Sequence, residues 1–424
     1  MNSTANFLIL SLTLAIAYSS PEVYHIKHSE NDECPKQPCL TLNEFTDYLK
    51  DHSSFTKLEL VFLYGNHTLD KALIFNGNSS QSQYSNNLSL SIYSHESSCI
   101  NIICETLNAR FEIHSLSNAN ISGLSFIGCS GNKFDSVHDL VLEDVEFIGH
   151  AIGNKSTLTM VFSTAVINRS KFHGDKRKIS YTEAPSNGEV VTVRNSNVTF
   201  ISCEFNQESI YIGQTTKMHT SSDSEKQNFK YEASITIIDS NFTNTNSSCG
   251  GAVYATNAIV NLERSWFSNS MATERGGAIY ANKSVVTITE SHFDDNMAAY
   301  GGVISAVASD LKISSSSFVN NTASRKYGGV AYIVSSRVNI YGSHFDSNTA
   351  KIFGGVIYAR ICIPFVINLP LSLLLPPSLS LSHELPLSPL FRSPFSLQGI
   401  IFLSLQLRQQ EFNLIELLRT MSMK

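Results

Sequence analysis

The chain has 424 residues and a formal net charge of −6, from 30 basic and 36 acidic residues. The basic residues form no run or stripe, so we expect no nucleic acid partner. The length would suit two ordinary domains, but a solenoid grows in one dimension and needs only one continuous core.

The first 19 residues are predicted to be a secretory signal peptide. An uncharged apolar run at residues 7–17 is followed by small residues, Ala17 and Ser19, at the two positions that a signal peptidase inspects. The run is too short to span a bilayer. We therefore expect an extracellular or cell-surface protein without a transmembrane span.

Residues 20–54 are expected to contain a disulfide and a cap helix. Cys34 and Cys39 are close in sequence and would pair in an oxidising compartment. The helix is predicted over residues 40–50, with one apolar face formed by Leu42, Phe45, Tyr48 and Leu49. A helix here would cover the first coil of a solenoid, whose bare end would otherwise expose its core.

The other cysteines of the secreted body have no assignable partners. Cys99 and Cys104 would face opposite sides of a regular strand, so pairing them directly would require a bend. The partners of Cys129, Cys203 and Cys249 stay open. No CxxC pair occurs, so structural zinc is not indicated, and we expect no metal or cofactor.

Residues 250–359 repeat one block about every 25 to 27 residues, which is typical of a solenoid. Each block opens with a Gly pair, at 250/251, 276/277, 301/302, 328/329 and 354/355. Two aliphatic residues follow two positions apart, and then a Ser and a Phe two positions apart; the Phe residues are Phe267, Phe293, Phe318 and Phe345. Spacing by two places each pair on one side of a strand. The Gly pair would allow a positive φ or a tight backbone approach.

The same half-pattern occurs upstream, ending at Phe126, Phe147, Phe172, Phe205 and Phe242. We therefore predict an all-β parallel β-helix over residues 55–359, with one Phe stacked on the next along the interior. Two polar insertions, 176–188 and 218–230, interrupt the spacing. We expect them to leave the same corner of neighbouring coils and to form binding loops, in which the candidate contact residues are Lys176, Arg177, Lys178, Tyr181 and Glu183. Passive surface excursions are the alternative.

Eleven Asn-x-Ser/Thr sequons predict a heavily glycosylated exterior. They begin at Asn66, Asn78, Asn87, Asn120, Asn154, Asn168, Asn197, Asn241, Asn246, Asn282 and Asn320.

The pattern stops at Ala359. Residues 360–424 form a low-complexity tail rich in Leu, Ser and Pro, without a sequon or Gly pair. Our interpretation is that this tail translates non-coding DNA. A membrane anchor is the alternative, but its prolines would break an apolar helix.

Two motifs recur in the blocks: GGAI- or GGAV-type pairs, such as Gly276-Gly277-Ala278-Ile279, and FxxN, such as Phe293 to Asn296. Both motifs resemble the repeats of the polymorphic outer-membrane protein family. That family comprises surface adhesins with a right-handed, single-stranded β-helix of the pectin-lyase-like superfamily. The resemblance implies this fold, and an adhesive or structural role through binding of extracellular glycans or proteins. The Asn of FxxN is expected to form a ladder along the coils or a left-handed corner.

An enzyme is the alternative function, because pectin-lyase-like folds also host polysaccharide lyases and hydrolases. Such enzymes need clustered carboxylates or an acidic calcium site. Asp294 and Asp346 lie two coils apart, ~9.6 Å in a regular stack, as do His292 and His344. We therefore expect no catalytic or metal site. Trp266, in the same outward column as the two histidines, is a candidate carbohydrate contact.

Overall fold

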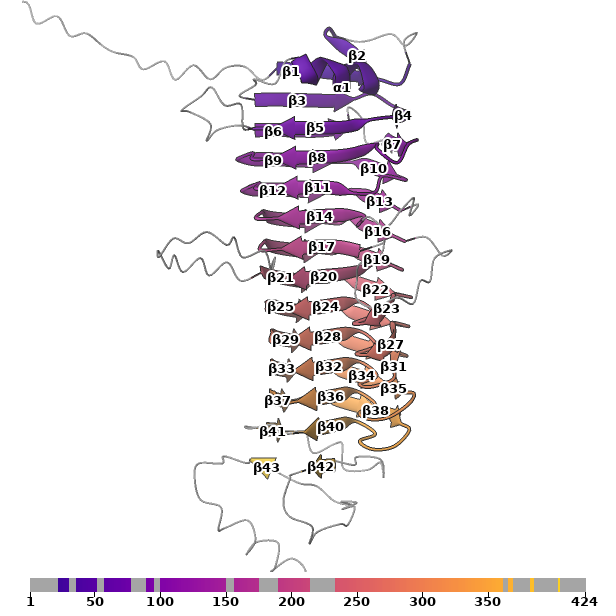
Figure 1. The fold of residues 1–424 in the computed structure, drawn as a ribbon, viewed down its shortest axis with the longest axis vertical. Helices are drawn as coiled ribbons and strands as arrows, with labels where there is room; N and C mark the ends of the chain where they lie inside the picture. Colours follow the sequence, from indigo (N-terminus) through magenta and orange to yellow (C-terminus); the bar gives the residue numbers. More distant parts are fainter. Residues whose placement is uncertain are drawn as a thin grey trace, which may run out of the picture.

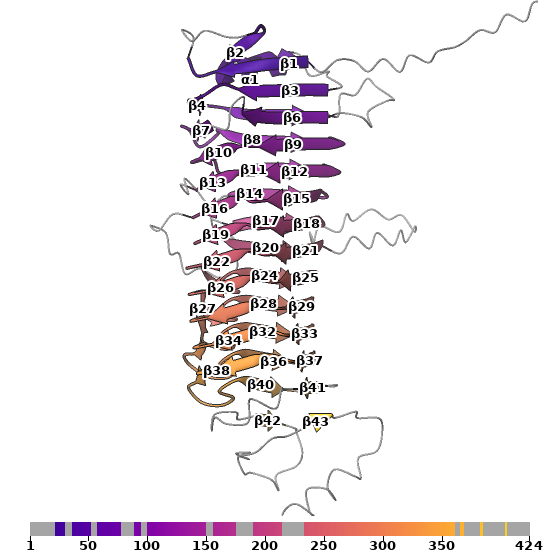
Figure 2. The same ribbon diagram turned by 180° about the vertical axis from the view of Figure 1, so that it is seen from behind.

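The computed structural model describes residues 22–29, 36–51, 57–77, 89–94, 100–149, 156–174, 190–213 and 233–360, and the backbone of 365–368, 382–384 and 403–404. These residues form one column of stacked strands with helix α1 (Leu42–Asp51) at its N-terminal end (Figure 1). The view from behind shows the same regular stacking (Figure 2).

Three long sheets run along the column, and each coil of the chain adds one strand to each sheet in the order A, B, C. Each strand pairs in parallel with its equivalents in the preceding and following coils, apart from the antiparallel contact of the last strand of sheet A. The fold is therefore a parallel β-helix, which confirms the fold class predicted from the sequence. A right-handed coil is the hand that nearly all parallel crossovers take.

Sheet A contains, in spatial order, β2 (Cys39–Thr41), β1 (Glu22–Lys27), β3 (Lys57–Phe62), β6 (Ser89–Ser94), β9 (Asn118–Ser122), β12 (Asp139–Glu143), β15 (Thr164–Asn168), β18 (Asn197–Ile201), β21 (Ala233–Ile238), β25 (Ala258–Glu263), β29 (Val285–Thr289), β33 (Asp310–Ser314), β37 (Arg337–Tyr341), β41 (Phe365–Asn368) and β43 (Leu403–Ser404).

Sheet B contains β4 (Asn66–Leu69), β7 (Ile100–Cys104), β10 (Leu124–Ile127), β13 (Glu146–Ile148), β16 (Lys171–His173), β19 (Glu204–Asn206), β22 (Asn241–Thr243), β26 (Trp266–Ser268), β30 (His292–Asp294), β34 (Ser317–Val319) and β38 (His344–Asp346).

Sheet C contains β5 (Ala72–Asn76), β8 (Arg110–His114), β11 (Asn132–Asp135), β14 (Leu158–Val161), β17 (Val190–Arg194), β20 (Ser209–Gly213), β24 (Val253–Thr256), β28 (Ile279–Asn282), β32 (Ile304–Val307), β36 (Ala331–Val334), β40 (Ile357–Arg360) and β42 (Ser382–Glu384). Between sheets B and C, the later coils add the short sheet D: β23 (Asn246–Cys249), β27 (Met271–Arg275), β31 (Met297–Ala298), β35 (Thr322–Ala323) and β39 (Thr349–Ala350).

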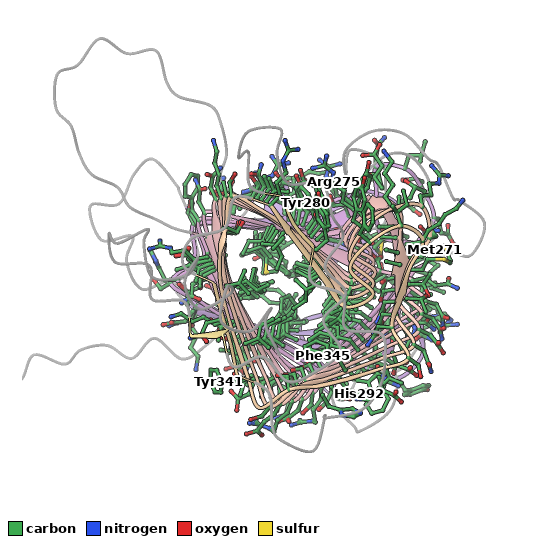
Figure 3. All side chains as sticks on the ribbon, turned by 90° about the horizontal axis from the view of Figure 1, so that it is seen from below. Met271, Arg275, Tyr280, His292, Tyr341 and Phe345 are labelled. Carbon is green, nitrogen blue, oxygen red and sulfur yellow. A yellow bond between two sulfur atoms is a disulfide. The ribbon has the colours of Figure 1, made fainter. Side chains whose placement is uncertain are left out.

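The interior is filled by residues that alternate with less buried positions along most strands, as a pleated strand requires. The Phe residues predicted to stack do so from Phe126 to Phe345, where Figure 3 shows the last of them inside the column. Their ring centroids lie between 4.2 Å (Phe205–Phe242) and 5.3 Å (Phe147–Phe172) apart.

The corners are held by ladders of buried polar side chains. After sheet A, the backbone N–H of each Ser donates to the Oγ of the Ser one coil on, as from Ser265 to Ser291 at 3.2 Å. The Asn of FxxN forms a second ladder, in which the backbone N–H of Asn296 donates to Oδ1 of Asn321 at 2.9 Å. This confirms the ladder. The left-handed φ belongs instead to the residue before the Asn, such as Asp295 at 54°.

The two glycines of each pair have different roles. The first, for example Gly301, has a φ of +64°, which only a residue without Cβ adopts at little cost. The second packs against the next coil: a Cβ on Gly302 would lie 2.1 Å from the carbonyl oxygen of Gly329. The sequence left these two reasons as alternatives, and both hold.

The N-terminal end is covered as expected. Helix α1 begins with a capping box, in which the backbone N–H of Glu44 donates to Oγ1 of Thr41 (3.3 Å) and that of Thr41 donates to Oε2 of Glu44 (2.7 Å). Leu42 and Phe45 are buried against the first coil. The sequence analysis missed β1, which precedes the helix and pairs in parallel with β3.

One disulfide joins neighbouring coils, between Cys104 and Cys129. Cys39 is also disulfide-bonded, but Cys34 lies outside the described residues, so their pairing stays a prediction. Cys203 and Cys249 are free thiols. In the tail, β41 and β42 extend sheets A and C in register with the previous coil. The interpretation of the tail as translated non-coding DNA is untested.

Candidate binding surfaces

A column of tyrosines runs along the outer face of sheet C. Successive coils place Tyr211, Tyr254, Tyr280, Ser305, Tyr332 and Tyr358 opposite one another. Ring centroids are 5.4 Å apart for Tyr211–Tyr254 and 4.9 Å for Tyr254–Tyr280. The column points away from the core, because the flanking residues in each strand, such as Val253 and Ala255, are buried in it. Four of its tyrosines are partly exposed (Tyr211, Tyr254, Tyr280 and Tyr332), whereas Ser305 and Tyr358 are buried.

A second set of aromatic residues covers the interruption at Ser305, which is fully buried. Tyr300, Tyr327 and Phe353 each precede a Gly pair. Tyr300 lies 5.0 Å from Tyr332 between ring centroids, and Tyr327 lies 4.5 Å from Tyr358. We call the two sets together the aromatic strip: Tyr211, Tyr254, Tyr280, Tyr300, Tyr327, Tyr332, Phe353 and Tyr358.

Cations lie on the aromatic strip. The guanidinium of Arg275 is 5.8 Å from the ring centroid of Tyr300, and Nζ of Lys326 is 5.2 Å from it on the next coil. Figure 3 shows Arg275 and Tyr280 side by side on the outside of the column. A hydrogen bond with Tyr300 raises the pKa of Lys326, and burial raises the pKa of Tyr254 to about 12. At neutral pH Lys326 is therefore charged and the phenol of Tyr254 is protonated.

Summed over residues 246–360, the two sides of the column differ in charge. One side is formed by the segments through sheets D and C, which are residues 246–257, 271–282, 297–308, 322–334 and 349–360. These segments contain one acidic residue, Glu274, and five basic residues: Arg275, Arg325, Lys326, Lys351 and Arg360. The segments through sheets A and B (258–270, 283–296, 309–321 and 335–348) contain six acidic and four basic residues. The fold thus places positive charge on the aromatic side of a chain whose net charge is −6.

The outward column of sheet B is arranged as expected. Trp266, His292, Ser317 and His344 follow one another on successive coils. Trp266 is 48% exposed, and its ring centroid is 3.9 Å from that of His292. Burial lowers the pKa of His292, against the opposing effect of Asp294.

The column does not gather metal ligands or paired carboxylates. Ser317 separates the two histidines, and Val319 separates Asp294 from Asp346. Within the described ranges, no group of three or more His, Cys, Asp and Glu residues is placed to hold a metal ion.

The predicted binding loops do not share a corner, so that prediction is wrong. Residues 176–188 follow β16 of sheet B and precede β17 of sheet C, whereas residues 218–230 follow β20 of sheet C and precede β21 of sheet A. The error arose because the period was counted from Phe to Phe, which does not show where in a coil the extra residues lie. The candidate contacts in the first insertion, such as Tyr181, lie outside the described residues.

Eight sequon asparagines are described, and none of them is buried: Asn66, Asn120, Asn168, Asn197, Asn241, Asn246, Asn282 and Asn320. Asn78, Asn87 and Asn154 lie outside the described residues.

The sequence analysis missed the aromatic strip, although a signal for it was present. Tyr254, Tyr280, Tyr332 and Tyr358 each follow the second Gly of a pair by three positions. The column could have been found by aligning that position across the blocks.

No helix in the described ranges has the length and apolar character needed to cross a membrane. Neither a protein-family model nor a curated protein sequence matches the chain, so the resemblance to polymorphic outer-membrane repeats rests on its motifs alone.

Three solved structures are similar to the chain at low sequence identity. The surface adhesin PfbA of Streptococcus pneumoniae has a TM-score of 0.45 and 12% identity, over 74% of this chain and 89% of the adhesin. ORF18 of Geobacillus virus E2 has a TM-score of 0.33 and 13% identity, over 73% and 54%. The A-module of the mannuronan C-5 epimerase AlgE6 of Azotobacter vinelandii has a TM-score of 0.29 and 7% identity, over 80% and 90%.

Proposed function

We propose that this protein is a secreted or cell-surface β-helix glycoprotein that binds an anionic polysaccharide along the aromatic strip, without catalysis. The observation that carries the proposal is that tyrosines and cations lie together on one side of the column. Arg275 and Lys326 pack on Tyr300, and the segments that form this side contain five basic residues against one acidic residue.

The chemistry of the strip suits carboxylate or sulfate groups on a sugar polymer. Arginine and lysine donate charge-assisted hydrogen bonds to such anions. The rings of Tyr211, Tyr254 and Tyr280 pack against one another, so much of each ring face is covered and the partly exposed hydroxyl edges can donate to sugar oxygens. Phe353, 47% exposed, adds an apolar ring surface. Since the coils repeat at ~4.8 Å, these groups recur along the axis, which suits a polymer lying along the column.

Secretion is supported by the predicted signal peptide, by the finding that none of the eight described sequon asparagines is buried, and by the Cys104–Cys129 disulfide. Disulfides of this kind form and persist in oxidising compartments.

The test uses the full chain secreted from a glycosylating host. Binding is measured to polygalacturonate, heparin, neutral dextran and duplex DNA at two salt concentrations. We expect binding to one or both anionic polysaccharides, weakened by salt, and little binding to dextran. Binding to DNA in preference to both would contradict the proposal, and release of reducing sugar or unsaturated uronide would favour an enzyme.

A matched pair of variants locates the site. Arg275→Gln with Lys326→Gln removes two cations from the strip, whereas Arg264→Gln with Arg337→Gln removes one cation just after β25 and one from β37, away from the strip. Loss of two charge-assisted hydrogen bonds should weaken binding by about tenfold or more for the first pair. The second pair should bind as the unmodified protein does. Equal weakening by both pairs would show non-specific attraction and refute the site.

A further inference from the structure

Asn241 and Trp266 occupy consecutive positions in one outward column of sheet B. β22 and β26 pair in parallel with Asn241 opposite Trp266, and β26 and β30 pair with Trp266 opposite His292. The next residues, Phe242 and Phe267, are fully buried, so Asn241 and Trp266 both point away from the core. The column is independent of the aromatic strip, which lies on sheet C.

The two sides of the Trp266 indole have different neighbours. His292 packs on the side of the following coil, with 3.9 Å between ring centroids. Asn241 lies on the side of the preceding coil, one strand spacing of ~4.8 Å away. Trp266 is still 48% exposed. The indole therefore keeps accessible surface next to an exposed asparagine.

Asn241 is the first residue of the sequon Asn241-Phe242-Thr243. An N-linked glycan is attached through the side-chain amide nitrogen, so its first sugar would begin directly beside the indole. The face of an aromatic ring carries partial negative charge and attracts the C–H groups of a sugar ring. Among the eight described sequon asparagines, Asn241 alone faces an aromatic residue on an adjacent coil; Asn197, for example, faces Thr164 and Ser234.

We propose that Asn241 carries an N-linked glycan whose first N-acetylglucosamine packs against the exposed surface of Trp266, opposite His292. The sugar and the imidazole then enclose the indole from both sides. The glycan is held against sheet B and extends from that face as an ordered feature. This proposal shares with the proposed function only the premise of secretion, and it fails or succeeds separately from polysaccharide binding.

The chain contains a single tryptophan, so tryptophan fluorescence reports on this position alone. The full chain is secreted from a glycosylating host, and site occupancy is measured by mass spectrometry of glycopeptides. Acrylamide quenching of fluorescence then compares the unmodified protein with Thr243→Ala, which keeps Asn241 and removes its glycan. Asn197→Gln removes a glycan from sheet A and is the matched control.

We expect Asn241 to be occupied, Thr243→Ala to raise the quenching constant and shift emission to longer wavelength, and Asn197→Gln to change neither. An unoccupied Asn241 in the secreted protein would overturn the proposal. Equal quenching in Thr243→Ala and the unmodified protein would overturn it as well.

Enzymatic trimming tests the same point on the folded protein, should Thr243→Ala not be secreted. An endoglycosidase that leaves one N-acetylglucosamine on each asparagine should leave the quenching constant unchanged, because the packed sugar remains. Complete removal by a peptide N-glycosidase should raise it. A change on trimming to one sugar would show that outer sugars, not the first, shield Trp266.

Discussion

The buried asparagine ladder makes the sharpest prediction for stability, at Asn321. Its Oδ1 accepts from the backbone N–H of Asn296 at 2.9 Å and from Nδ2 of Asn296 at 3.0 Å. Its Nδ2 donates to the carbonyl oxygen of Phe293 and to Oδ1 of Asn348, both at 3.0 Å. Asn321 is fully buried, so water cannot replace these partners.

Asn321→Ala should destabilise the protein by about 3 to 5 kcal/mol. The buried N–H of Asn296 loses the acceptor that Asn321 provides, which costs about 1 to 3 kcal/mol, and each of the other three lost hydrogen bonds adds about 0.5 to 1.5 kcal/mol. Part of this sum is recovered, because Nδ2 of Asn296 keeps the carbonyl of Phe267 and Oδ1 of Asn348 keeps the backbone N–H of Asn321.

The assay is urea unfolding of the full chain, with Asn339→Ala as the control, because Asn339 is exposed on β37. The control should change stability by no more than about 0.5 kcal/mol. Equal costs for the two variants would refute the argument that the ladder holds the coils together.

Asn321→Asp separates charge from shape. It keeps one acceptor oxygen but buries a carboxyl group, whose folded-state pKa should therefore rise above about 3.9. The folded state then binds more protons than the unfolded state, so the deficit relative to the unmodified protein should shrink as pH falls towards 4. A deficit that grows on acidification would contradict this reasoning.

Three further predictions concern the core, a corner and the surface. Phe318 lies between two stacked phenylalanines, so Phe318→Ala should lower the free energy of unfolding in urea by about 3 to 5 kcal/mol, whereas His344→Ala, on the outer face, should lower it by less than about 0.5 kcal/mol. Equal losses would mean that the inward and outward faces of these strands are assigned wrongly. Gly302→Ala should cost about 3 kcal/mol or more, since its Cβ would lie 2.1 Å from a carbonyl oxygen of the next coil, and a thermal unfolding temperature equal to that of the unmodified protein would contradict this packing. Because burial lowers the pKa of His292, the folded state binds fewer protons than the unfolded state, and the free energy of unfolding that this residue contributes falls as the pH drops below 6.5. Trp266 fluorescence should therefore titrate with a midpoint below 6.5, and His292→Gln should abolish that titration.

The sequence was sufficient for the fold because the repeat itself carries the geometry. A Phe that recurs at a fixed distance from an aliphatic pair can be buried on every coil only if the coils stack in register, as Phe293, Phe318 and Phe345 do. The cap helix was also predictable from local signals, namely Thr41 and Glu44 at capping-box spacing and one apolar face. Strand β1 was missed because a six-residue strand has no local partner, and its pairing partner β3 begins only after 29 intervening residues.

The candidate surfaces depended on the tertiary structure to a greater degree. Composition showed 30 basic residues without a run or stripe, and the gathering of Arg275 and Lys326 around Tyr300 appears only when coils of 25 to 27 residues are stacked. The corners from which the two insertions leave were likewise decided by where β17 and β21 start.

The sequence by itself determined which residues are inside and which residues stack, because period, alternation and glycine placement are local properties that every coil repeats. The tertiary structure alone decided which outward residues of different coils become neighbours around a corner, as Tyr327 and Tyr358 do, and which cysteine pairs with Cys104. The physical reason is that a binding surface or a disulfide depends on the position of a side chain within a closed coil, whereas the core pattern depends only on its spacing along the chain.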